Sequence, residues 1–192
     1  MTELDPDDEQ SFSDQNSSAH QLIMIFGLGN PLLGDDGVGW AIAHEVQSRL
    51  VLVQKDLEVK SNFRVQIDSL SLGGLSLMER LAGCQKAILI DAIVTGKHPM
   101  GTVLQFEMED LPATNIGHLS SAHDVSLPIA LEVGRSMGVP LPQKIMIVAV
   151  ESQIVYEFSE ELSAPVAAAV PEATKLVMQL LDQLVSDLNR KE

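Results

Sequence analysis

The sequence predicts an α/β fold, a three-layer α/β/α sandwich around a mostly parallel, twisted central sheet of about five strands. Short apolar runs, typical of strands buried on both faces, recur along the chain. Between them lie stretches with helical spacing of apolar residues, and this alternation is the order expected of α/β folds. A length of 192 residues with 45% apolar content suits one domain with a sizeable core.

The expected elements follow one another from residue 21 onward. Strands are expected at Leu22–Gly27, Phe63–Ile67, Ala87–Ile90, Thr102–Phe106 (an edge strand) and Ile145–Val150. Helices are expected from near Asp36 to near Leu50, at Leu75–Leu81, along the stripe Leu127, Ala130, Leu131 and Gly134, and from Val166 to Leu188. Ser163 suits the N-cap of the last helix. Pro171 should kink that helix rather than end it, because the apolar stripe continues on both sides.

Charge and composition exclude several classes of protein. Residues 1–20 carry six acidic side chains and no Lys or Arg, which is the composition of a disordered tail, so the domain is expected to comprise residues 21–192. The net charge of −15 disfavours nucleic acid and anionic membrane surfaces. No apolar run approaches the roughly 20 residues that a bilayer requires, and the acidic N-terminus is unlike a signal peptide. We therefore expect a cytoplasmic protein, most simply a monomer.

Two carboxylates follow the first expected strand, in the segment Gly27–Gly39 (GLGNPLLGDDGVG). A dinucleotide-binding G-x-G-x-x-G pattern would need glycine where the chain has Leu32, and Asp35 and Asp36 would repel a pyrophosphate. One of these aspartates is expected to cap the helix that follows. The other would project from the carboxyl edge of the sheet, where ligands bind in parallel α/β folds.

Asp91 and His123 are further candidates at this edge. Asp91 follows a buried strand, where a carboxylate is costly unless it is hydrogen-bonded, paired or metal-bound; an Asx turn into the next loop is the alternative. His123 precedes the third helix, whose N-cap is either Ser121 or Ser126. The positive end of a helix favours the neutral imidazole that binds metals, whereas an exposed loop histidine is the simpler alternative.

Other catalytic schemes lack their residues. The sequence has no G-x-S-x-G nucleophile elbow, no H-E-x-x-H zinc motif and no pair of cysteines. The single cysteine, Cys84, precedes an apolar strand, which favours a packing role and excludes a disulfide framework. The carboxylates and the histidine at the sheet edge remain the candidates.

Taken together, Gly27–Gly39, Asp91-Ala92-Ile93 and Ser121-Ala122-His123 resemble the nickel–iron hydrogenase maturation endopeptidases, in an order and spacing that extend from residue 22 to about residue 184. The resemblance implies an endopeptidase that removes a short C-terminal extension from the precursor of the hydrogenase large subunit, late in maturation, after nickel insertion. After the last strand, relatives often have a proline-containing turn, whereas this chain has Glu151-Ser152-Gln153. The difference affects the shape of one wall of the cleft that the resemblance implies.

The resemblance also assigns the site, because it places the metal ligands, which are also the catalytic residues, at Asp36, Asp91 and His123. Two carboxylates and an imidazole suit a divalent ion such as nickel or zinc. The resemblance implies that the substrate supplies the nickel, for which zinc or cadmium can substitute, so that cleavage awaits metal insertion. Either the metal polarises the scissile carbonyl or a carboxylate activates water, as in aspartic-type peptidases; the sequence leaves both open.

Three other functions compete with this interpretation. A nickel-binding assembly chaperone would use the same ligands without cleaving a peptide bond. The opening GLGNP also resembles peptidyl-tRNA hydrolases, but the net charge of −15 and the adjacent Asp35 and Asp36 disfavour RNA. A generic nucleotide-binding domain is disfavoured by the interrupted glycine pattern.

Overall fold

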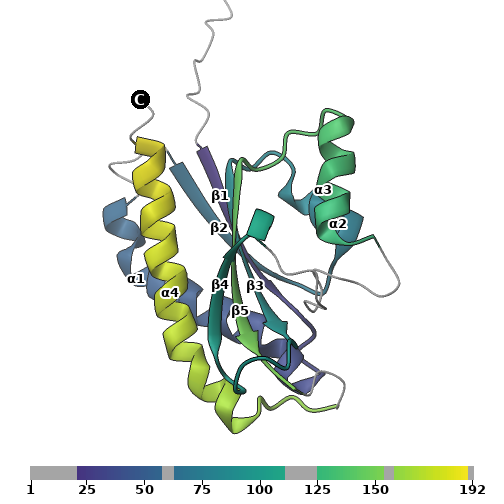
Figure 1. Cartoon of the computed structure of the whole chain (residues 1–192). Helices are drawn as coiled ribbons and strands as arrows, with labels where there is room; N and C mark the ends of the chain where they lie inside the picture. Colours follow the sequence, from purple (N-terminus) through teal and green to yellow (C-terminus); the bar gives the residue numbers. More distant parts are fainter. Residues whose placement is uncertain (1–20, 58–62, 111–124, 154–157, 190–192) are drawn as a thin grey trace, which may run out of the picture.

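A computed structural model describes residues 21–57, 63–110, 125–153 and 158–189 of the chain (Figure 1). The strands are β1 (Gln21–Leu28), β2 (Phe63–Leu70), β3 (Lys86–Ile93), β4 (Val103–Glu107) and β5 (Lys144–Glu151). The helices are α1 (Val38–Leu57), α2 (Gly74–Leu81), α3 (Leu127–Ser136) and α4 (Ala164–Asn189), with short 3₁₀ helices η1 (Gly34–Gly37) and η2 (Met108–Asp110). The expected N-terminal tail, residues 1–20, lies outside the described residues.

The strands form one five-stranded sheet in the order β2-β1-β3-β5-β4. The pairs β1–β2, β1–β3 and β3–β5 are parallel, and β4 runs antiparallel to β5 at the edge of the sheet. Helices α1 and α4 cover one face of the sheet, and α2 and α3 cover the other (Figure 1). The three-layer sandwich and the edge position of the fourth strand are therefore confirmed. No helix in the described ranges combines the length and apolar character needed to cross a membrane.

The strand order reverses at β1, because β2 and β3 pair with its opposite edges. Helix α1, which connects β1 to β2, packs on one face of the sheet through residues such as Ile42. Helix α2, which connects β2 to β3, packs on the other face through residues such as Leu77. Such a reversal opens a crevice at the carboxyl ends of the two central strands, which is where ligands bind in open α/β sheets. In this protein the reversal lies between the ends of β1 and β3, and this expected position of a ligand is called the crevice below.

Most element boundaries agree with the sequence pattern to within a few residues. The strand expected to end at Ile90 continues to Ile93, because β3 is central and its pairing with β5 extends to Glu151. The first helix continues beyond Leu50, and η1 precedes it. Pro171 lies inside the continuous α4, so the expectation that it would not end the helix is confirmed.

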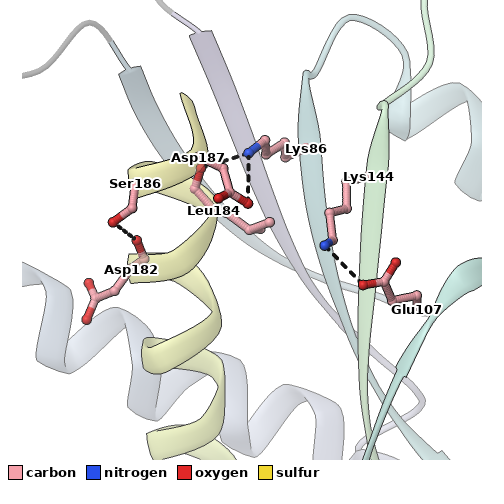
Figure 2. Close-up of polar contacts among 7 residues, drawn as sticks. All are labelled: Lys86, Glu107, Lys144, Asp182, Leu184, Ser186 and Asp187. Atoms are coloured by element: carbon pink, nitrogen blue, oxygen red, sulfur yellow. Dashed lines mark hydrogen bonds and ion pairs between the residues drawn. The ribbon is translucent and has the colours of Figure 1, made fainter. Parts of the chain in front are cut away.

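A buried lysine attaches the C-terminal part of α4 to the sheet (Figure 2). Lys86, the first residue of β3, is 5% exposed, and its Nζ donates a hydrogen bond of 2.9 Å to the carbonyl oxygen of Leu184. The same Nζ lies 3.9 Å from a carboxylate oxygen of Asp187. A buried ammonium is costly unless it finds such partners. Lys86 therefore anchors α4 at the amino edge of the sheet, opposite to the crevice.

Candidate functional site

The glycines of the segment Gly27–Gly39 allow it to pack tightly over the ends of β1 and β3. Gly29 has a φ of +126°, and a Cβ at this position would overlap the carbonyl oxygen of Asp36. A Cβ on Gly39 would lie 2.5 Å from the carbonyl oxygen of Ile90 in β3. The glycines are therefore needed for close approach of backbone to backbone, and this brings η1 next to the carboxyl end of β3.

Asp36 lies in η1 and is 6% exposed. The backbone N–H of Asn30 donates a hydrogen bond of 2.7 Å to its Oδ2, and the Asn30 side-chain oxygen in turn accepts one of 3.0 Å from the N–H of Leu32. These bonds tie the turn after β1 to η1. The Asp36 carboxylate is thus buried and fixed in position by its hydrogen bond to this turn.

Asp91 lies inside β3 and is fully buried. The prediction that it ends the strand and the alternative that it opens an Asx turn are both wrong, because the chain stays extended for two more residues. Its Oδ1 accepts a hydrogen bond of 2.9 Å from the N–H of Ala92. Pairing between β1 and β3 ends one residue earlier, at Ile90, so Asp91 borders the crevice. Strand alternation places its side chain with those of Leu89 and Ile93, on the face covered by α2 and α3.

Two of the three predicted site residues lie on elements that contact each other, because η1, which carries Asp36, contacts β3, which carries Asp91. His123 lies outside the described residues. Helix α3, which follows it in sequence, begins at Leu127 with Ser126 at the N-cap position, although the Ser126 side chain makes no capping hydrogen bond. Within the described ranges, no group of three or more His, Cys, Asp or Glu side chains is arranged to hold a metal ion. The predicted three-ligand set therefore stays a prediction.

The second aspartate of the pair has a role that the sequence did not reveal. Asp35 is 2% exposed, and it accepts hydrogen bonds from the Ser163 N–H (2.6 Å), the Ser163 hydroxyl (2.8 Å) and the Ser152 hydroxyl (3.2 Å). For Asp35, the expectation of a cap on the following helix is corrected, since Asp35 binds the start of α4 rather than that of α1. Ser163 does stand at the N-terminus of α4, but its hydroxyl donates to Asp35.

Glu151 is a further buried carboxylate that the sequence pattern did not single out. It ends β5, is fully buried, and accepts hydrogen bonds from the N–H groups of Thr95 and Gly96 (both 2.8 Å) and from the Thr95 hydroxyl (2.7 Å). Glu151 belongs to the segment that replaces the proline-containing turn of relatives. Its hydrogen bonds attach this segment to the loop after β3. Glu151 could have been found from the sequence by the same signal as Asp91, namely a carboxylate at the end of an apolar strand.

Cys84 is expected to be chemically inert in the folded protein. Burial raises the pKa of its thiol from 9.0 to about 11, so the thiolate is scarce at pH 8. We expect the native protein to resist iodoacetamide at pH 8 and the unfolded protein to react, as followed by mass spectrometry. Rapid alkylation of the native protein would contradict the packing role of this cysteine.

Comparison with known proteins identifies the family. The family model for hydrogenase maturation proteases matches residues 51–180. The hydrogenase 2 maturation protease of Escherichia coli K12 is 29% identical over 128 residues, which cover 67% of this chain and 71% of that protein. A putative hydrogenase maturation protease of Methanocaldococcus jannaschii is 30% identical over 160 residues, which cover 81% of this chain and 94% of the relative.

A solved structure supports the same assignment. The hydrogenase maturating endopeptidase HybD from E. coli superposes with a TM-score of 0.66 at 26% identity, covering 85% of this chain and 93% of that one. HybD of Thermococcus kodakarensis shares the fold, with a TM-score of 0.58 at 23% identity and coverage of 83% of this chain and 99% of that one. The sheet topology and these similarities lead to one conclusion: the chain belongs to the hydrogenase maturation protease family and is an endopeptidase.

Proposed function

We propose that this endopeptidase removes the C-terminal extension of a hydrogenase large-subunit precursor after nickel insertion, and that Asp36, Asp91 and His123 recognise the metal and carry out the cleavage. The proposal also takes the protein to act as a monomer in the cytoplasm, on a protein substrate rather than on nucleic acid, which the net charge of −15 disfavours.

The observation that supports the proposal is that two buried carboxylates lie on contacting elements, η1 and β3, at the point where the strand order reverses. Asp36 reaches this point from η1 after β1, and Asp91 reaches it from β3. Asp36 accepts a hydrogen bond from the backbone N–H of Asn30, and Asp91 accepts one from the backbone N–H of Ala92. Two negative charges in a site of low exposure favour a divalent cation and disfavour a phosphate group.

The donor set suits nickel carried by the substrate. Carboxylate oxygens, together with the imidazole nitrogen of His123, form an O,O,N set for a divalent ion of intermediate hardness. The substrate's nickel would be recognised by these ligands and would draw the scissile bond into the crevice. A carboxylate that is not engaged by the metal can hold and accept the proton of an attacking water, which is the role of a general base.

A cleavage assay separates the peptidase from a nickel-binding assembly chaperone. Purified protein is incubated with nickel-loaded large-subunit precursor, and the masses of the products are determined. We expect the loss of one C-terminal peptide from the precursor, with many precursor molecules cleaved per molecule of this protein. Stable binding of the precursor without any change in its mass would favour the chaperone and contradict the proposal.

A further inference from the structure

The carboxylate of Asp35 joins three parts of the molecule at the carboxyl edge of the sheet. It belongs to η1, it binds Ser152 just after β5, and it binds Ser163 just before α4. Two backbone hydrogen bonds strengthen the same junction, from the Gly34 N–H to the Ser159 carbonyl (2.7 Å) and from the Ser159 N–H to the Leu32 carbonyl (3.1 Å). The segment that contains Asp36 is therefore fastened to the chain that leads into α4.

Asp35 is unsuited to act on substrate itself. It is 2% exposed, and three donors already occupy its two oxygens. It also lies at the N-terminus of the 26-residue helix α4, whose positive end stabilises a carboxylate. Charge-assisted bonds of this kind are among the stronger hydrogen bonds in proteins, so the junction should be rigid.

We propose that Asp35 is a positioning residue, which fixes η1 against α4 and β5 and thereby holds the Asp36 carboxylate in its catalytic position. This inference rests on the proposed function, in which Asp36 takes part in cleavage. The two residues are adjacent in a four-residue 3₁₀ helix. If the loss of Asp35 allowed η1 to rotate, Asp36 would move with it. Small displacements of a catalytic group are costly, because reaction requires near-contact geometry.

The molecule provides a matched control at the opposite end of the same helix. Lys86 holds the C-terminal part of α4 through the Leu184 carbonyl, as Asp35 holds its N-terminus through Ser163. Lys86 is buried and charged like Asp35, but it lies at the amino edge of the sheet, away from the crevice. Lys86→Met is therefore expected to weaken the attachment of the C-terminal part of α4 and to leave the contacts of η1 unchanged.

The test compares Asp35→Ala, Asp35→Asn and Lys86→Met for kcat, KM, melting temperature and hydrogen exchange of residues 30–37. We expect Asp35→Ala to lower kcat by about tenfold to a hundredfold, with KM changed less than about twofold, and to speed exchange in this segment. Asp35→Asn should keep kcat within about threefold of wild type, because its amide oxygen can accept the Ser163 N–H and its amide N–H can donate to a serine hydroxyl. Lys86→Met should lower the melting temperature yet keep kcat and the slow exchange of residues 30–37.

Several outcomes would overturn the inference. If Asp35→Ala and Lys86→Met lose kcat in proportion to their loss of melting temperature, Asp35 is merely structural. If Asp35→Asn is as inactive as Asp35→Ala, the charge rather than the positioning matters. If Asp35→Ala fails to fold, Ser163→Ala, which removes one partner, must still lower kcat and speed exchange. If the wild-type protein cleaves no precursor, the proposed function fails, while the exchange measurement still tests whether Asp35 holds η1.

Discussion

Replacement of Asp36 or Asp91 by asparagine is expected to leave a folded protein that cleaves the large-subunit precursor about 10²- to 10⁴-fold more slowly, the range that a positioned acid–base group contributes. Each substitution removes a negative charge that would bind the substrate's metal or activate water. Asparagine keeps a side-chain oxygen for the N–H of Asn30 (2.7 Å) or of Ala92 (2.9 Å). The measurements are the rate of loss of the C-terminal peptide, by mass spectrometry, and the melting temperature.

Asparagine is a sharper probe than alanine at these two positions. Alanine would leave the N–H of Asn30 or Ala92 without its present acceptor, at a cost of about 1–3 kcal/mol if the group stays buried. The removal of one of two neighbouring negative charges should offset part of any such loss. Near-wild-type cleavage by both asparagine variants would show that the carboxylates are structural.

The histidine assignment is tested within the same series. His123→Ala is expected to abolish cleavage and His118→Ala, five residues earlier in the sequence, is expected to retain it. The physical reason is that a neutral imidazole completes the oxygen-rich ligand set, whereas His118 has no place in the motif. If His118 proves essential and His123 dispensable, the assignment of the third ligand is wrong.

Metal-free enzyme is expected to cleave nickel-loaded precursor and to leave nickel-free precursor intact. The ligand set of Asp36, Asp91 and His123 contains no thiolate and leaves coordination positions open, so on its own it should bind a divalent ion weakly. Coordination would be complete only when the substrate's ligands hold the same metal. The enzyme is treated with a chelator, desalted and checked for residual metal, and the two precursor forms are then compared in parallel.

A control distinguishes this mechanism from that of an ordinary metallopeptidase. A permanent catalytic zinc is also commonly held by three protein ligands, so the number of ligands alone does not decide between the two. Efficient cleavage of nickel-free precursor by zinc-loaded enzyme would contradict recognition of substrate nickel. Nickel-loaded precursor cleaved equally well before and after chelator treatment of the enzyme would support it.

Much of the fold could be predicted from local pattern because its three central strands are buried along almost their whole length. In β1, β3 and β5 almost every residue is buried, so each appears in the sequence as a continuous apolar run. Helices α3 and α4 each show an apolar stripe at helical spacing. The continuation of β3 beyond Ile90 could not be predicted, because its cause is pairing with β5 and not the local sequence. For the same reason Asp91 was expected at the end of a strand and lies within one.

The sequence by itself determined the alternation of elements and the carboxylates available at the sheet edge, since these depend on residue types at short spacing. Only the tertiary structure decided the strand order, and hence that η1, which carries Asp36, contacts β3, which carries Asp91. It also decided which aspartate of the adjacent pair is structural. Asp35 is bound by Ser152 and Ser163, more than 100 residues away along the chain, and no local pattern encodes a contact of that separation.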